Sequence, residues 1–362
     1  GYYEPRRVNN LKELVKNSVE KYGNAVGFKF KNKEGKITEK TYVEFNSDID
    51  CLGTALISLG LKDKNISIIS ENRYEWGVCY LSIVNGTGVA VPLDKYLPKI
   101  EIENLVERGK VEAIFYSPSY QHIMDEISKT NNRIKHFICM ENVANITFTD
   151  SRFVTLPELI ERGRALLDTG DRSFVDSPID ESKMCVLLFT SGTTSMSKGV
   201  MLSHSNIASN VTGISTIINA GPDDVYLSLL PLHHTFENTI GLLYMVHSGV
   251  CVAYSDGIKH VAQNLKEYGV TLLVAVPAIL EAVYRRVKDG IKKLGKEKLF
   301  NILIMLSDML RFIGIDVRRK LFKSVFNQLG PRLRLAVSGA APLNPEVVTW
   351  FDKIGLKLLE GY

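Results

Sequence analysis

Two patterns of hydrophobic residues alternate along this chain. Short apolar runs rich in Ile, Val and Leu indicate buried strands, and between them apolar residues recur every three or four positions, as in amphipathic helices. Strands that alternate with helices favour parallel sheets covered by helices on both faces. The expected strands lie at 66–69, 89–91, 113–116, 134–140, 225–229, 250–254, 272–276, 333–337 and 356–359.

Two regions depart from this alternation. Residues 26–30 and 36–40 flank a polar turn and predict an antiparallel hairpin. Residues 141–182 are polar and irregular, with one helix expected near 157–167. We therefore expect two α/β subdomains, residues 1–182 with the hairpin and residues 183–362.

One apolar helix stands out by its flanking charge. Residues 298–313 are strongly apolar, and residues 285–298 contain seven basic side chains against two acidic ones. The helix could belong to a core or interface, and the basic segment that precedes it would then be exposed to solvent. It could also rest on an anionic membrane surface. No apolar stretch of the chain reaches the roughly eighteen residues of a membrane span.

Composition and charge bear on the size of the core, on nucleic acid as a partner and on the cellular compartment. With 362 residues and 45% hydrophobic residues, the chain can bury a large core. The net charge of +4 is too mild to favour nucleic acid as a partner. The five cysteines are scattered without a C-x-x-C pair, as expected of buried free thiols in a reducing compartment. The N-terminus lacks the apolar core of a signal peptide, so we expect a cytoplasmic protein, with peripheral membrane contact as the alternative.

The most informative segment for chemistry follows an apolar run at 186–190. It is a loop that carries five hydroxyl side chains around Gly192 and ends in Lys198. Backbone amides in such a loop can point inward together and cradle a phosphate, and Lys198 would add a mobile positive charge. The hydroxyl residues are Ser191, Thr193, Thr194, Ser195 and Ser197.

This loop is not a nucleotide-binding P-loop. In the pattern G-x-x-x-x-G-K-[ST], Ser197 stands in place of the second glycine and Gly199 in place of the magnesium-binding hydroxyl. A P-loop also runs directly into a helix, whereas residues 199–202 read as a strand. A P-loop kinase or NTPase is therefore disfavoured.

Residues 189–200 instead resemble the phosphate-binding signature of the adenylate-forming superfamily, aromatic-T-S-G-[ST]-T-G-x-P-K-G-V. Ser195 and Ser197 replace the glycine and proline of that pattern. Three later segments match the superfamily in the right order. They are 230–237, similar to the P-L-x-H-x-F-E form of long-chain acyl-CoA synthetases, 337–343, similar to S-G-A-A-P-L, and 360–362, similar to the start of [QE]-G-Y-G-x-T-E.

The resemblance assigns roles to these segments. His234 would lie between the carboxylate substrate and the route of the CoA thiol. His234 and Lys198 are the expected catalytic residues. Tyr362 would stack on adenine. The nucleotide would be held by Thr190, Ser191, Gly192, Thr193, Thr194, Lys198, Gly339, Ala340, Ala341, Pro342, Glu360, Gly361 and Tyr362, and the acid by His234, Thr235, Ser338 and Gly339.

The resemblance implies the large N-terminal domain of the adenylate-forming fold. Two mostly parallel sheets would be sandwiched by helices, with part of a small β-subdomain and without the C-terminal lid. The implied activity is ligation of a fatty acid to coenzyme A with ATP and Mg²⁺. The Thr and Glu that help hold magnesium, and the lid lysine, belong to parts of the family pattern that this chain lacks. We therefore expect nucleotide binding with little turnover and no metal ligands in this chain.

Three alternatives stay open at this point. An acyl-AMP ligase could deliver its product to an acyl carrier protein instead of CoA. A synthetase for shorter or aromatic acids would carry the same nucleotide signatures. The chain could also serve as a nucleotide or acyl-adenylate binding module without catalysis.

Overall fold

The chain divides into two compact units. The computed structural model describes residues 2–144, 148, 150–190 and 197–361. The first unit comprises residues 1–220 and 231–249, and the second comprises residues 221–230 and 250–362. This division differs from the expected boundary between 182 and 183. The reason is that β8 (Met184–Thr190) pairs with β4 (Val89–Pro92) in the sheet of the first unit.

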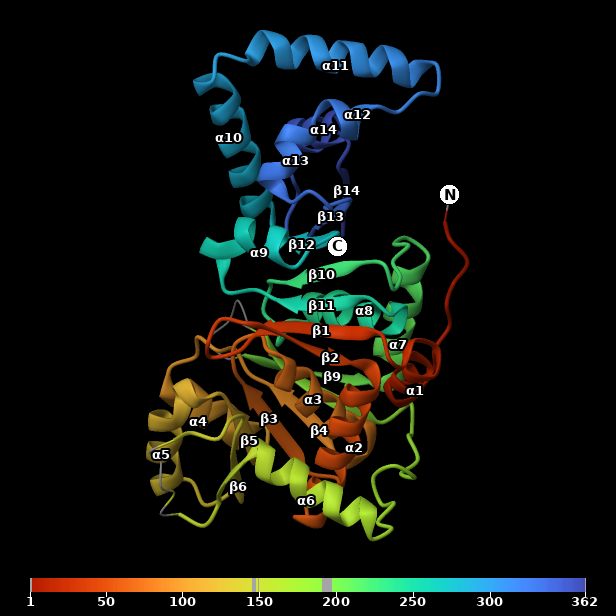
Figure 1. The fold of residues 1–362 in the computed structure, drawn as a ribbon. Coiled ribbons are helices and arrows are strands. Elements are labelled where there is room, and N and C mark those ends of the chain that lie inside the picture. Colours follow the sequence, from red (N-terminus) through yellow and green to blue (C-terminus); the bar gives the residue numbers. More distant parts are fainter. Residues whose placement is uncertain (1, 145–147, 149, 191–196, 362) are drawn as a thin grey trace. The chain divides into compact units, whose positions relative to one another are not determined.

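The first unit is built on a seven-stranded sheet in the order β7-β6-β5-β3-β4-β8-β9 (Figure 1). Neighbouring strands are parallel except for the edge strand β9, which runs antiparallel to β8. An antiparallel hairpin of β1 (Val26–Lys31) and β2 (Ile37–Thr41) also belongs to this unit. The remaining strands are β3 (Asn65–Ile69), β5 (Val111–Tyr116), β6 (His136–Cys139), β7 (Phe153–Thr155) and β9 (Lys198–Ser203).

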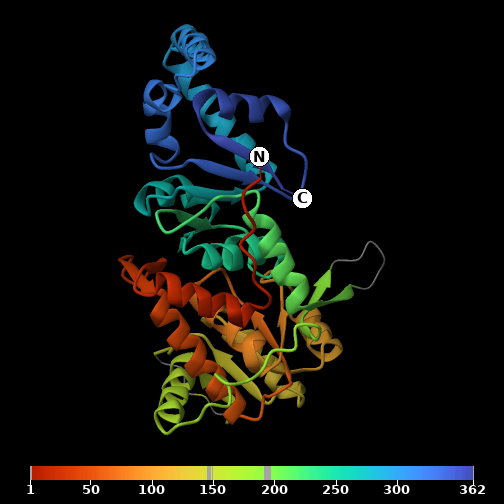
Figure 2. The same ribbon diagram turned by 90° about the vertical axis from the view of Figure 1, so that its right-hand side faces the viewer.

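Helices cover both faces of this sheet. α4 and α5 lie on one face, and α2, α3 and α6 lie on the other (Figures 1 and 2). The helices of the unit are α1 (Leu11–Tyr22), α2 (Tyr42–Ser58), α3 (Tyr74–Ser82), α4 (Lys99–Arg108), α5 (Gln121–Thr130), α6 (Leu156–Asp168), α7 (His204–Ser215) and α8 (Met245–Ser248). They are joined by the π-helices η1 (Ile83–Thr87) and η3 (Glu237–Tyr244) and the short 3₁₀ helix η2 (Pro118–Tyr120).

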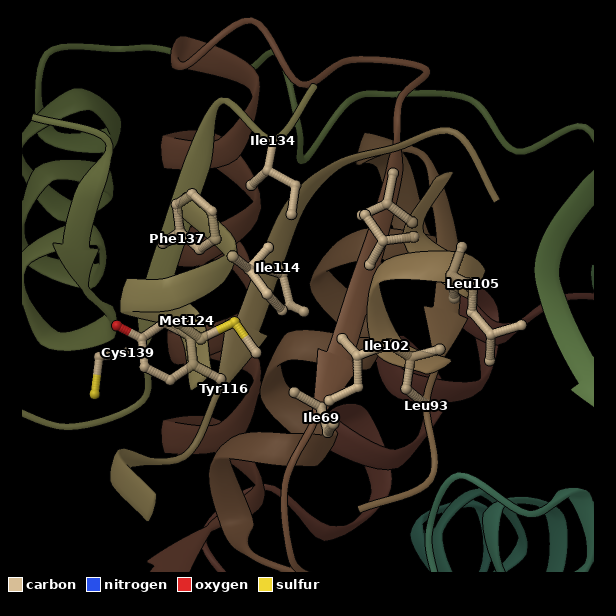
Figure 3. Packing of buried hydrophobic residues seen from close by; sticks show 14 of the residues in the cluster. Ile69, Leu93, Ile102, Leu105, Ile114, Tyr116, Met124, Ile134, Phe137 and Cys139 are labelled. Atoms are coloured by element: carbon tan, nitrogen blue, oxygen red, sulfur yellow. The ribbon is translucent and has the colours of Figure 1, made fainter. Parts of the chain in front are cut away.

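The core between the sheet and α4 and α5 is fully apolar. Ile102 on α4 and Met124 on α5 are completely buried against Ile69, Ile114 and Phe137 of the strands (Figure 3). Burial of side chains of this size stabilises the fold by about 1.5–3 kcal/mol each. Leu187 and Phe189 of β8 also pack against this core, so it holds the strand that leads into the candidate site.

The second unit contains five parallel strands in the order β14-β13-β12-β10-β11. They are β10 (Val225–Ser228), β11 (Cys251–Tyr254), β12 (Leu272–Ala275), β13 (Leu335–Ser338) and β14 (Lys357–Glu360). The accompanying helices are α9 (Val261–Glu267), α10 (Pro277–Lys293), α11 (Glu297–Phe312), α12 (Arg318–Leu321), α13 (Lys323–Leu329) and α14 (Pro345–Ile354), with the 3₁₀ turn η4 (Ile258–His260).

The two mostly parallel sheets flanked by helices confirm the expected fold class. All nine expected strands and the hairpin are present. The sequence missed β7, because three residues are too few to show a periodic pattern. The helix α10 continues to Lys293 through a polar, basic last turn.

Candidate active site

The hydroxyl-rich loop is closed at its base by two paired strands. β8 and β9 form an antiparallel pair in which Phe189 lies opposite Gly199 and Thr190 lies opposite Lys198 (green strands in Figure 2). Residues 191–196 lie outside the described residues, so the expected roles of Ser191, Gly192, Thr193 and Thr194 remain predictions. The strand after the loop is confirmed, and it distinguishes this loop from a P-loop, which leads into a helix.

An arginine from a neighbouring helix holds the end of this loop. At the last residue of α4, Arg108 donates from Nη1 to Oγ of Ser197 at 3.0 Å and from Nη2 to its backbone oxygen at 2.7 Å. The guanidinium also lies 5.3 Å from the ring centroid of Phe189, a cation–π distance. Ser197, which departs from the family pattern, is therefore tied to α4 directly beside the exposed Lys198.

The two adjacent histidines have different surroundings. His234 is exposed, and its Nδ1 accepts a hydrogen bond from the backbone N–H of Phe236 at 3.2 Å. The side chain of His233 is 23% exposed, and its Nε2 lies 3.8 Å from a carboxylate oxygen of Asp94. Burial lowers the pKa of His233, although Asp94 raises it in part, so the imidazole is neutral at pH 7. His234 thus remains the accessible histidine.

His233 and Thr235 line an apolar pocket in the first unit. The enclosed cavity has a volume of only about 20 Å³, room for about one water molecule, and the space reaches about 270 Å³ when the open region at its mouth is included. Most of its wall comes from the strands that flank the loop and from α7, and its polar edge comes from the segment 233–239. The apolar wall consists of Tyr80, Pro92, Val186, Leu188, Leu202, Ile207 and Leu232.

Sequence reasoning missed Asn238 in this pocket. Its side chain is 8% exposed, and Nδ2 has no hydrogen-bond partner among the described residues. A buried amide of this kind is unusual unless a ligand or water supplies the missing acceptor. An isolated asparagine inside an apolar helix carries no sequence signal for such a role.

In the second unit, two predicted segments meet at one edge of the sheet. β13 and β14 are parallel and pair Ser338 with Glu360, so both segments lie at the carboxyl ends of these strands. Glu360 accepts through Oε1 from the backbone N–H of Leu343 at 3.0 Å. The N–H of Gly361 donates to the carbonyl oxygen of Ser338 at 2.7 Å. Ligands of α/β sheets bind at this kind of edge.

Local backbone geometry supports an open platform at this edge. Ala340 adopts a left-handed conformation with φ 72°, which is uncommon for a residue with a Cβ atom. Ala340, Ala341 and Pro342 are exposed, whereas Gly339 is buried and donates its N–H to the carbonyl oxygen of Ala275 at 3.1 Å. A flat ring can approach backbone that carries such small side chains.

Ser338 offers a free hydroxyl at the same edge. The residue is 1% exposed, and its Oγ has no hydrogen-bond partner among the described residues. The structure therefore brings together Ser338 to Pro342, Glu360 and Gly361 in the second unit, and Thr190 and Lys198 in the first. Tyr362 lies outside the described residues.

Comparison with known proteins gives the family. The sequence matches the AMP-binding enzymes over residues 15–362. It is 28% identical over 336 residues to the peroxisomal long chain acyl-CoA synthetase 6 of Arabidopsis thaliana, and 28% identical over 343 residues to long-chain-fatty-acid–CoA ligase 1 of Homo sapiens. These alignments cover 89% and 86% of this chain and 47% of each relative. The chain thus spans about half the length of these curated relatives.

Solved structures show the same fold. The adenylation domain of a carboxylic acid reductase from Segniliparus rugosus, solved with AMP and a carboxylic acid, has a TM-score of 0.77 at 18% identity and covers 98% of this chain and 60% of its own. The N-terminal domain of FACL13 from Mycobacterium tuberculosis has a TM-score of 0.69 at 16% identity, with coverage of 98% and 76%. With the family match over nearly the whole sequence, the chain belongs to the AMP-binding enzyme family.

Proposed function

We propose that this chain forms the nucleotide- and acid-binding part of a fatty acid–CoA ligase. The reaction has two steps. A carboxylate oxygen attacks the α-phosphorus of ATP, and the bond to the bridging oxygen breaks to release pyrophosphate. The CoA sulfur then attacks the acyl carbonyl, and AMP leaves. The first step joins two anions, so it depends on charge neutralisation and alignment.

The observation that carries this proposal is the strand–loop–strand geometry around Lys198. The loop closed by the pair of Thr190 and Lys198 offers hydroxyls, amides and one ammonium group to a polyphosphate. Lys198 would balance charge on the β- and γ-phosphates and on the departing pyrophosphate. The segment from Ser338 to Pro342, braced by Glu360, would receive the adenine ring, and Tyr362 would stack on it.

The pocket of the first unit supports an apolar acid as the substrate. Its wall is formed by aliphatic and aromatic side chains, whereas His233, Thr235 and Asn238 form a polar edge. The apolar wall would contact the first carbons of a hydrocarbon chain, since the enclosed cavity of about 20 Å³ does not hold a whole chain. His234, which is exposed beside this pocket, would hydrogen-bond the carboxylate or the acyl phosphate that replaces it.

Magnesium would arrive with ATP. Among the described residues, no group of three or more His, Cys, Asp or Glu side chains is placed to hold a metal ion.

Nucleotide titration tests the proposal. We expect the 362-residue chain to bind both ATP and AMP in calorimetric titrations. Lys198→Ala should weaken ATP binding about tenfold or more and leave AMP binding within about twofold, because AMP lacks the phosphates that Lys198 contacts. Lys183→Ala is the matched control, since Lys183 is exposed just before β8. Equal losses for ATP and AMP, or no nucleotide binding by the unaltered chain, would contradict the proposal.

The acid and the acceptor require a second assay. The intact gene product should form a thioester when it is incubated with ATP, CoA and long-chain fatty acids, as measured by mass spectrometry. Product formed only with an acyl carrier protein would show that CoA is not the acceptor. Product formed only with aromatic acids would show that the substrate is not a fatty acid. Nucleotide binding without any adenylate would indicate a binding module.

A further inference from the structure

An apolar stripe lies exposed along α11. Nine of the nineteen exposed large apolar side chains in the described part of the chain fall within residues 294–315. Ile302 is 56% exposed, Met309 is 63% exposed and Phe312 is 92% exposed. Such a concentration is uncommon on a soluble domain and marks an interaction surface. The stripe itself is formed by Leu299, Ile302, Met305, Leu306, Met309, Phe312 and Ile313.

The opposite face of α11 already has its partners. Phe300 packs against Phe322 and Trp350, with ring centroids 5.1 and 6.0 Å apart. Ser307 is buried, and Arg311 donates to Asp352 at 2.7 Å. The helix is thus anchored to the second unit by one face, and Figure 1 shows it at the outer end of that unit. Its exposed face is a second apolar surface beyond the one that the fold uses.

Basic residues precede the stripe, and all seven basic side chains within residues 285–298 are exposed. At the other end of the helix, Arg318 is paired with Asp316 and Asp352, and Arg319 donates to the backbone oxygens of Pro331 and Leu333. Four of the lysines within residues 285–298 form no ion pair with any described residue, so their charge is available to an external partner. They are Lys292, Lys293, Lys296 and Lys298.

We propose that α11 rests on an anionic membrane surface. The apolar stripe would enter the boundary between headgroups and acyl chains, and the flanking lysines would contact anionic headgroups. α11 is short for a membrane span, and no helix among the described residues is long and apolar enough to cross a bilayer. This proposal does not depend on the proposed function, although a fatty substrate would be delivered from the same surface.

Charge and shape favour a membrane over other occupants. A second copy packed in parallel along the stripe would bring the two lysine clusters together, and like charges at a seam are unfavourable. The exposed face of a single helix is also a convex ridge. A protein partner needs a matching groove, whereas a fluid interface adapts to a ridge.

Vesicle sedimentation tests the proposal with two matched sets of variants. We expect the chain to sediment with vesicles of phosphatidylcholine and phosphatidylserine, and much less with phosphatidylcholine alone. Ile302→Glu and Met309→Glu, made singly, should each reduce the bound fraction several-fold. Ile258→Glu is the control, because Ile258 is 70% exposed on the same unit outside the stripe.

The second set tests the charge. Lys292→Glu with Lys293→Glu should lower binding to anionic vesicles by about tenfold or more. Lys259→Glu with Lys266→Glu changes the net charge equally at exposed positions elsewhere and should have little effect. Unfolding midpoints by circular dichroism would show that all variants are folded.

Three outcomes would overturn the proposal. Absence of sedimentation with anionic vesicles would exclude the membrane surface. Equal binding of the stripe variants and their control would show that another surface is used. A dimer in sedimentation equilibrium that Ile302→Glu abolishes, without vesicle binding, would assign the stripe to a second copy of the chain.

Discussion

At the scale of single residues, Ala340 is the clearest sign of a specialised backbone. Its φ of 72° places a Cβ atom in the left-handed region, which costs roughly 1–2 kcal/mol for an L residue. Strained residues of this kind occur often at ligand sites. From the sequence, Ala340 was chosen because of its small side chain. The structure shows in addition that its backbone adopts a strained, left-handed conformation.

This strain gives a prediction about stability. Ala340→Gly should leave the free energy of unfolding unchanged or raise it by up to about 1 kcal/mol, because glycine adopts positive φ readily but gains entropy when unfolded. Ala340→Val should lower it by about 1–2 kcal/mol, since a β-branched residue fits this region poorly. Urea denaturation measures both. A destabilising glycine variant would contradict this account of the site.

Arg108 is a positioning residue in this structure. It is bonded to Ser197 and stacked on Phe189, so it fixes the residue next to Lys198. Arg108→Ala should weaken ATP binding several-fold, by roughly 1 kcal/mol, and leave AMP binding unchanged. Arg133→Ala is the control, because the guanidinium of Arg133 is bonded at 2.7 Å to Glu107 beside Arg108.

A rescue experiment separates positioning from general stability. Adding Ser197→Pro to Arg108→Ala inserts the proline of the family pattern, and the fixed φ of proline would stiffen the loop end again. Recovery of ATP binding is the expected result. Equal loss of ATP and AMP binding in Arg108→Ala would indicate that Arg108 only maintains the fold.

At the scale of elements, the π-helix η3 is packed unusually tightly. Glu237 is completely buried in it, and a Cβ atom added to Gly241 would lie 2.3 Å from Oε1 of Glu237. The polar edge of the pocket is formed by the start of the same helix. The motif at 230–237 therefore depends on a glycine four residues beyond its end.

Two alanine substitutions test this packing. Gly241→Ala should destabilise the protein by about 1–3 kcal/mol, because the glutamate or the helix must move. Gly213→Ala in α7 should instead stabilise it by about 0.5–1 kcal/mol, since an added Cβ atom meets no atom within 4 Å. Thermal unfolding followed by circular dichroism compares the two. Similar effects of both variants would refute the tight packing of η3.

At the scale of the whole molecule, buried histidines couple stability to pH. His204 follows the cap residue Ser203 at the start of α7 and is 2% exposed. The backbone N–H of Leu11 donates to its Nδ1 at 3.1 Å, so Nε2 carries the proton and donates to the carbonyl oxygen of Val84 at 2.8 Å. Burial lowers the pKa of His204, although the bond to Val84 raises it in part.

The direction of the pH effect follows from the lowered pKa. As the pH falls, this histidine is protonated in the unfolded chain before it is protonated in the folded protein. The stability that neutral His204 contributes is therefore present above about pH 6.5 and is lost as the pH falls below it. Desolvation also lowers the pKa of His136, His233 and His247. Asp50 acts in the opposite direction, since burial raises its pKa to about 6, so the contribution of His204 is measured as the difference between a variant and the parent protein.

Denaturation at several pH values checks this prediction. The free energy of unfolding should decrease between about pH 7.5 and pH 5.5, and His204→Gln should show a smaller decrease because it removes one titrating group. His122→Gln is the control, as the His122 side chain is 85% exposed. If stability rises on acidification, or both variants keep the dependence of the parent protein, the role of His204 is refuted.

The alternation of strands and helices and the order of the four site segments follow from the amino-acid sequence alone. Periodicity reports local burial, so it predicted every long element, whereas the three-residue strand β7 was too short to register. The resemblance selected Ser338 and Glu360 from their local patterns. Their direct pairing across β13 and β14 required the sheet register.

Which side chains are exposed, and which lie side by side, depends on the three-dimensional fold. The contact of Arg108 with Ser197 joins positions 89 residues apart, and the pocket with Asn238 is lined by five separate segments. The apolar positions of α11 have the same helical spacing that a core helix would show. Spacing along the chain does not say what packs against a helix face. The sequence therefore left open whether α11 is a core helix or a surface helix, and the fold leaves its apolar stripe exposed.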